Sequence, residues 1–209
     1  MAERTRALKR LHGLLRDLLP GGVTGKLSAE RAASILRGIR PHGSASERLR
    51  RRLASEVVRD VRTLDRKIAD LSGRIEAEVQ ASGTTLTQIF GIGPILAARI
   101  IGSVGDVARL PTRAHFASYS GTAPVEASSG EVVRHRLSLA GNRKLNYALH
   151  MVAVCQGRSD ARGGAYYRKK IAQGKSCKEA LRCLIKRRVT DAVFRSLVAD
   201  SQASARSAA

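Results

Sequence analysis

The residues with the clearest potential for chemistry are two adjacent serines, Ser128 and Ser129, which precede Gly130 in a glycine-punctuated stretch. A serine hydroxyl can attack a phosphodiester if it loses its proton and if the non-bridging phosphate oxygens are neutralised. Arg134 and Arg136 follow closely and carry the positive charge that the second requirement needs. The same pattern also fits an ordinary turn whose hydroxyls bond the local backbone. The residues alone leave both interpretations, nucleophile and turn, open.

A second stretch with a clear physical function is the turn Gly91-Ile92-Gly93, which is followed by Pro94. Apolar residues flank it at helical spacing, so the sequence predicts a helix-hairpin-helix over residues 84–105. Glycines permit positive φ and a close backbone approach, and proline suits the first turn of a helix. Free amides at a helix start can bind a phosphate. We therefore expect Gly91, Gly93 and Arg99 to contact a nucleic-acid backbone.

The charge of the chain limits the classes of partner. Lys and Arg number 38 against 17 Asp and Glu, which gives a net charge of +21. Such an excess favours a polyanion, so DNA is the expected partner. No apolar run has the length of a membrane-spanning helix, and the N-terminus lacks the apolar core of a signal peptide. We expect a cytoplasmic protein that binds no membrane. The three cysteines lack the paired spacing of a zinc site.

Apolar periodicity predicts a mostly α-helical fold whose first part, residues 1–81, is helical and coiled-coil-like. Two short helices precede a long one, which begins with a capping box at Ser44 and Glu47. Apolar residues spaced by threes and fours along the long helix approximate a heptad seam: Leu49, Leu53, Val57, Val61, Leu64, Ile68, Leu71 and Ile75. The seam either pairs with a second copy, which we favour and which makes a homo-oligomer, or packs on the first two helices.

The second part, residues 82–198, is predicted as a separate helical domain. It contains the hairpin over 84–105, an irregular serine loop over 121–141, and further helices after the loop. Asn142, Arg143 and Lys144 begin the first of these helices, and we expect them to contact nucleic acid. Residues 199–209 are small and polar, which predicts a disordered tail.

Taken in order, these motifs resemble the C-terminal half of insertion-sequence transposases of the IS110, IS116 and IS902 family. In that family a GIG-type turn precedes a G-x-x-P element, a Ser-Gly pair and an S-x-x-G-N/H element. The matching residues here are Gly91-Ile92-Gly93, Gly121-Thr122-Ala123-Pro124, Ser129-Gly130 and Ser138-Leu139-Ala140-Gly141-Asn142. The resemblance implies a transposase C-terminal domain that binds DNA and a structured guide RNA. It assigns the nucleophile for strand exchange to Ser129, with Ser128 as the fallback.

Two departures from the family pattern affect this assignment. Leu139 stands where many members carry a basic residue. The family also begins with a ribonuclease-H-like domain whose four acidic residues, the D-E-D-D set, bind magnesium, whereas this chain opens on charged helices. We therefore expect no cofactor in this chain, magnesium in the missing acidic domain, and no activity of the chain alone. The alternatives are a non-catalytic helix-hairpin-helix DNA-binding protein and a coiled-coil structural protein.

Overall fold

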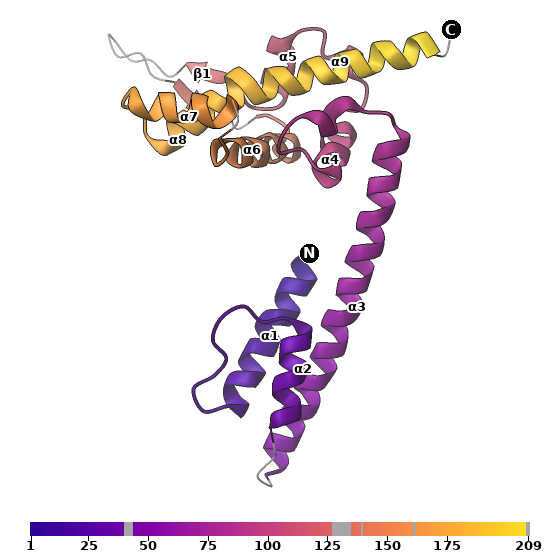
Figure 1. Ribbon diagram of the computed structural model, residues 1–209, viewed down its shortest axis with the longest axis vertical. Helices are drawn as coiled ribbons and strands as arrows, with labels where there is room; N and C mark the ends of the chain where they lie inside the picture. Colours follow the sequence, from indigo (N-terminus) through magenta and orange to yellow (C-terminus); the bar gives the residue numbers. More distant parts are fainter. Residues whose placement is uncertain (40–43, 127–134, 139, 161, 208–209) are drawn as a thin grey trace. The chain divides into compact units, whose positions relative to one another are not determined.

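The computed structural model describes residues 1–39, 44–126, 135–138, 140–160 and 162–207 (Figure 1). Over these residues the fold is mostly α-helical, which confirms the predicted class. Within them, no helix combines the length and the apolar character that crossing a membrane requires. The chain divides into two compact units, Met1–Arg74 and Ile75–Ala209. We describe each unit by itself.

The first unit contains α1 (Ala2–Leu18), α2 (Ala29–Gly38) and the part of α3 (Ala45–Ala81) up to Arg74. Gly21 and Gly22 follow α1 with φ values of 89° and 66°, which glycine adopts without strain. Ser28 caps α2 by accepting a hydrogen bond from the Arg31 amide, as its position before the apolar stripe indicates. Side chains from all three helices and from Leu27, which precedes α2, form the core of this unit: Leu11, Leu15, Leu27, Ala29, Ala32, Leu36, Ala54, Val57, Val58 and Val61.

The long helix α3 divides the predicted heptad seam between two environments. Val57 and Val61 are buried in the core of the first unit, among side chains of α1 and α2. Leu49, Leu53 and Leu71 remain 56%, 40% and 52% exposed. The middle of the seam therefore packs within the chain, whereas its outer leucines stay about half exposed.

The second unit is built around α6 (Arg143–Gly157), which contacts α4 (Pro94–Val104), α7 (Arg162–Ala172), α8 (Cys177–Leu184) and the π-helical turn η3 (Ile185–Val189). The inward side chains of α6 are fully buried: Leu145, Ala148, Leu149, Val152 and Ala153. The 3-10 turns η1 (Thr85–Gln88) and η2 (Val107–Arg109), α5 (Arg113–Tyr119) and α9 (Thr190–Ser207) complete the helical part. Strands β1 (Pro124–Glu126) and β2 (His135–Leu137) pair antiparallel.

The boundary between the two units and the end of the last helix differ from those predicted. The contacts divide the chain at Arg74 rather than after residue 81, because Ile75 and Val79 in the last turns of α3 pack in the second core. Residues 199–209, predicted as a disordered tail, instead continue α9 as far as Ser207. The Asp200 carboxylate anchors this stretch, since it accepts hydrogen bonds from the Thr84 hydroxyl, the Thr85 amide and the Thr85 hydroxyl at 2.7, 3.0 and 2.7 Å. Alanine and serine, although small, are compatible with a helix.

Candidate nucleic-acid interface

The predicted serine loop, residues 121–141, contains a two-stranded β-hairpin. Glu126 at the end of β1 pairs with His135 at the start of β2, so residues 127–134 join the strands. Ser128, Ser129 and Arg134 lie outside the described residues, and the side chain of Arg136 is likewise not described. The structure therefore establishes where this connection begins and ends, and the predicted roles of these residues stay predictions.

The G-x-x-P motif and the S-x-x-G-N motif meet at the base of the hairpin, where the backbones of Gly121 and Gly141 cross. A Cβ atom on Gly141 would lie 2.3 Å from the nitrogen and 2.4 Å from the Cα of Gly121, distances that no side chain tolerates. Gly121 has a φ of 67°. The Asn146 amide group donates a hydrogen bond of 2.9 Å to the Ser120 carbonyl beside the crossing. The glycines of both motifs are thus explained by a backbone crossing that holds the base of the hairpin.

Asn142 fixes the same crossing from the start of α6. Its backbone amide donates to the Tyr119 carbonyl at 2.7 Å, and its side-chain oxygen accepts from the amides of Lys144 and Leu145, which caps the helix. Its side-chain nitrogen donates to the Tyr119 hydroxyl at 3.0 Å, and that hydroxyl donates to the Ser103 carbonyl. These bonds give Asn142 a structural role, and its contact with nucleic acid stays a prediction.

A cavity of about 330 Å³ opens beside the crossing. One face of α6 supplies Arg143, Tyr147 and His150 to its wall, because positions i, i+4 and i+7 of a helix point the same way. All three side chains are exposed. Backbone and side chains at the crossing supply the remaining wall: Ser120, Gly121, Ser138, Gly141 and Asn146.

Helix α4 places a further positive charge, that of Arg99, over the ring of Tyr147. The guanidinium carbon of Arg99 lies 5.1 Å from the centroid of the Tyr147 ring, which is a cation–π contact. Within the described part of the chain, neither Arg99 nor Arg143 forms an ion pair. We call Arg99, Arg143, Tyr147 and His150 the α6 face. It combines uncompensated positive charge, an exposed aromatic ring and a cavity, which suits a phosphate backbone.

Sequence reasoning found the two arginines of the α6 face but missed Tyr147 and His150. The spacing from Arg143 was the signal that could have identified them, since a helix predicted to start at Asn142 places all three on one side. Lys144 is exposed but does not line the cavity.

The Gly91 turn packs directly against α6. Gly91 has a φ of 91°, and a Cβ atom there would lie 3.0 Å from the Cys155 Cβ and 3.3 Å from the Val152 carbonyl oxygen. The Gln156 side chain donates a hydrogen bond of 2.9 Å to the Phe90 carbonyl and fixes the turn further. Gly91 is therefore required by close packing inside the unit.

Gly93 has a different environment from Gly91. It is the N-cap of α4 with a φ of −88°, and a Cβ atom there would meet nothing within 4 Å. The helix after the turn begins at Pro94 as predicted, whereas the segment before the turn is the short 3-10 helix η1 rather than an α-helix. Whether this hairpin clamps a phosphate stays a prediction.

The family resemblance assigns magnesium to an acidic domain rather than to the residues described here. Among them, no three His, Cys, Asp or Glu side chains come together in a group that could hold a metal ion. We therefore derive no chemical step through a metal at the α6 face.

Comparison with known proteins confirms the family resemblance. Residues 83–168 match the model of the family described as "Transposase IS116/IS110/IS902 family". This segment contains the Gly91 turn, the β-hairpin, the crossing and α6. The similarity to this transposase family thus lies in residues 83–168.

Individual relatives agree with the family match. The chain is 34% identical over 123 residues to the "Insertion element IS110 uncharacterized 43.6 kDa protein" of Streptomyces coelicolor, covering 57% of this chain and 30% of that protein. It is 31% identical over 118 residues to a "Probable family 20 transposase" of Pseudomonas aeruginosa, covering 53% and 35%. Identity to the "Insertion element IS900 uncharacterized 42 kDa protein" of Mycobacterium paratuberculosis is 28% over 166 residues, covering 78% and 41%. The chain spans about a third of the length of these relatives.

Proposed function

We propose that this chain acts in DNA transposition and that its second unit binds DNA along the α6 face. The observation that carries the proposal is the position of this face. Arg99 and Arg143 flank the exposed Tyr147, and neither arginine is in an ion pair among the described residues. This group lies at the base of the hairpin, and the connection between the two strands includes Ser129. The net charge of +21 supports a polyanionic partner. The chain would act on bacterial DNA in the cytoplasm.

In this proposal Ser129 is the nucleophile on a DNA phosphate. Its oxygen forms a new bond to phosphorus while a phosphodiester P–O bond breaks, which leaves the strand joined to the protein through serine. The serine hydroxyl loses its proton, and the departing strand oxygen takes one up. Arginines of the connection and of the α6 face would neutralise the charge on the phosphate oxygens.

Two partners implied by the family belong to the proposal as well. A structured guide RNA would bind together with the DNA, and the acidic residues that hold magnesium in this family would be supplied by a polypeptide that carries them. When bound, magnesium would stabilise charge at the reacting phosphate. None of the described residues is assigned to hold it.

Removing the two arginines of the α6 face tests the binding surface. We expect Arg99→Gln combined with Arg143→Gln to weaken duplex binding by at least about 100-fold, because each of the two lost hydrogen bonds to a charged group contributes roughly 1.5–3 kcal/mol. The slope of log affinity against log salt should fall by about 1.8, since each phosphate contact contributes roughly 0.9. Fluorescence anisotropy titrations at several salt concentrations measure both quantities.

The matched control is Arg113→Gln combined with Arg206→Gln. Both side chains are exposed in the second unit, neither lines the cavity, and the charge change is identical. Equal losses in the two double variants would show that DNA binds through diffuse charge, and the α6 face would be rejected.

We also propose that the chain self-associates through the outer leucines of α3. Leu53→Glu combined with Leu71→Glu should convert the oligomer to monomers, because charge in a coiled-coil seam opposes pairing. Both side chains are exposed in the chain, so the fold of the first unit should survive. Ser55→Glu combined with Ala69→Glu, at exposed positions on the opposite side of α3, is the control. Sedimentation that finds the parent chain monomeric at high concentration would contradict the proposal.

A further inference from the structure

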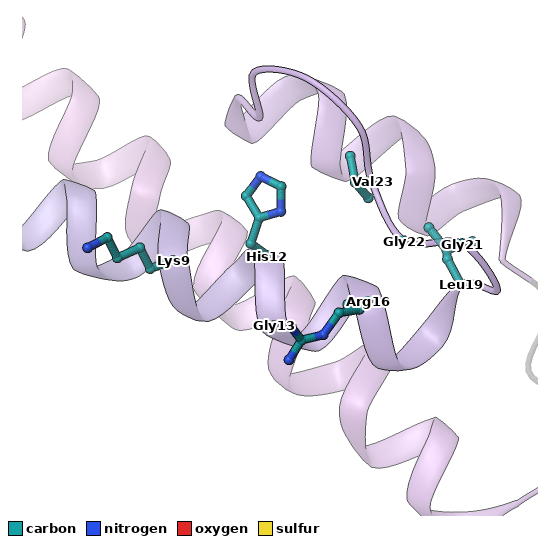
Figure 2. Close-up of a pocket in the computed structure, with 8 residues that line it drawn as sticks. All are labelled: Lys9, His12, Gly13, Arg16, Leu19, Gly21, Gly22 and Val23. Carbon is teal, nitrogen blue, oxygen red and sulfur yellow. The ribbon is translucent and has the colours of Figure 1, made fainter.

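The first unit contains a cavity of about 520 Å³ between α1 and the segment that leads from α1 to α2. Figure 2 shows Lys9, His12 and Arg16 along α1, with His12 directed towards the segment that carries Val23. The rest of the wall consists of small or apolar residues: Gly13, Leu19, Gly21, Gly22 and Val23. Nothing in the family match covers this cavity, because the match begins at residue 83.

The charge at this cavity is positive and uncompensated. Lys9, His12 and Arg16 stand at positions i, i+3 and i+7, so they share one side of α1, and no carboxylate lines the wall. The ion pairs described in this unit use other cations, those of Arg4, Arg50, Arg52 and Arg62. In the described part of the unit, Lys9 and Arg16 form no ion pair. Such a wall attracts an anion.

Gly13 indicates a ligand independently of the charge. A glycine inside a helix costs about 1 kcal/mol relative to alanine, and packing does not explain it here, because a Cβ atom on Gly13 would meet nothing within 4 Å. The bare backbone lies on the cavity wall between His12 and Arg16, where it permits a ligand to approach closely. Gly21 and Gly22 also line the cavity and add no side chains to a wall that includes Leu19 and Val23.

We propose that this cavity binds a phosphate group of a nucleic-acid strand. The Arg16 guanidinium can donate two parallel hydrogen bonds to phosphate oxygens, Lys9 supplies a point charge, and the His12 ring supplies an N–H donor. The volume lies within the range of about 300–1,000 Å³ typical of small-ligand sites, so a nucleotide unit fits as well as its phosphate. The site lies in the first unit and does not depend on the α6 face or on Ser129.

Ligand titrations of the full chain distinguish the source of the phosphate. The signal followed is the nuclear magnetic resonance of the His12 ring protons. That resonance is assigned by its loss in His12→Gln. The four ligands are inorganic phosphate, adenosine monophosphate, an RNA hairpin and a DNA duplex. We expect the resonance to shift with RNA or DNA, and the tighter of the two identifies the strand. If neither nucleic acid shifts the resonance, the proposal is overturned, even where inorganic phosphate does shift it.

Two pairs of variants separate the cavity from general charge. Lys9→Gln with Arg16→Gln should weaken binding of that nucleic acid about tenfold more than Arg6→Gln with Arg10→Gln, which removes the same charge from exposed positions of α1 outside the cavity. Gly13→Leu fills the cavity without changing charge and should also weaken binding tenfold, while Gly73→Leu on α3 should not. Leucine favours a helix more than glycine does, so Gly13→Leu should not lose binding by unfolding α1. Equal losses within each pair would overturn the proposal.

Discussion

Replacing Gly141 by alanine is expected to destabilise the second unit by about 3–5 kcal/mol, a loss at the upper end of single substitutions. The added methyl carbon would lie 2.3 Å from the Gly121 nitrogen and 2.9 Å from the Ser120 carbonyl carbon. These neighbours are backbone atoms, so no rotation of a side chain can relieve the overlap. The crossing itself would have to open, and with it the hydrogen bonds of Asn142 and Asn146. Denaturant titration followed by circular dichroism measures the loss.

Gly102→Ala is the matched control for this variant. Gly102 lies inside α4, and a Cβ atom there would meet nothing within 4 Å. Alanine should therefore stabilise the helix by up to about 1 kcal/mol, in the opposite direction. If Gly141→Ala unfolds at the same denaturant concentration as the parent chain, the two backbones do not approach as closely as the structure shows.

Ser129→Ala is expected to abolish a covalent link between the protein and DNA without reducing DNA affinity. The methyl side chain has no oxygen to attack phosphorus, whereas the binding surface on α6 is unchanged. The assay is denaturing electrophoresis of end-labelled DNA in magnesium, with this chain alone and together with a polypeptide that carries the acidic residues of the family. We expect a protein-linked strand in the second mixture and none in the first. Ser128→Ala should retain the link.

Each other result of that assay has a definite meaning. A link that persists in Ser129→Ala and disappears in Ser128→Ala would assign the nucleophile to Ser128. DNA binding without any link in either mixture would favour the non-catalytic helix-hairpin-helix protein over the transposase. Efficient cleavage by this chain alone would contradict the expectation that it is inactive without a partner polypeptide.

Local signals in the sequence were sufficient for the helices of the first unit. Ser28 and Ser44 each accept a hydrogen bond from an amide three residues later, and the glycines after α1 adopt positive φ. Such caps and stops act within one turn of backbone, so a single sequence contains them. The partition of the heptad seam was not predictable in this way. Val57 and Leu53 stand in the same pattern, and only packing among three helices buries one and exposes the other.

The site shows the same division between local and tertiary causes. The sequence assigned Gly91 and Gly93 one shared role, yet Gly91 is fixed by Cys155 and Val152 on α6, whereas Gly93 faces open space. Asn142 was predicted only to contact nucleic acid, and the structure adds a role as the cap of α6. The spacing from Arg143 could have indicated Tyr147, but its contact with Arg99, which is 48 positions earlier in the chain, was not predictable from one sequence. The side chains opposite a residue decide its role, and a single sequence does not identify them.

The closed base of the hairpin has a consequence for how the connection between β1 and β2 can evolve. Its two ends are held by the strand pair at Glu126 and His135 and by the crossing of Gly121 and Gly141 beneath. When the ends are held, doubling the length of a flexible connection costs only about 0.6 kcal/mol in closure entropy. Insertions between the strands are therefore expected to cost little folding free energy, so the reach of the serine towards a substrate can change while the scaffold at its two ends stays the same.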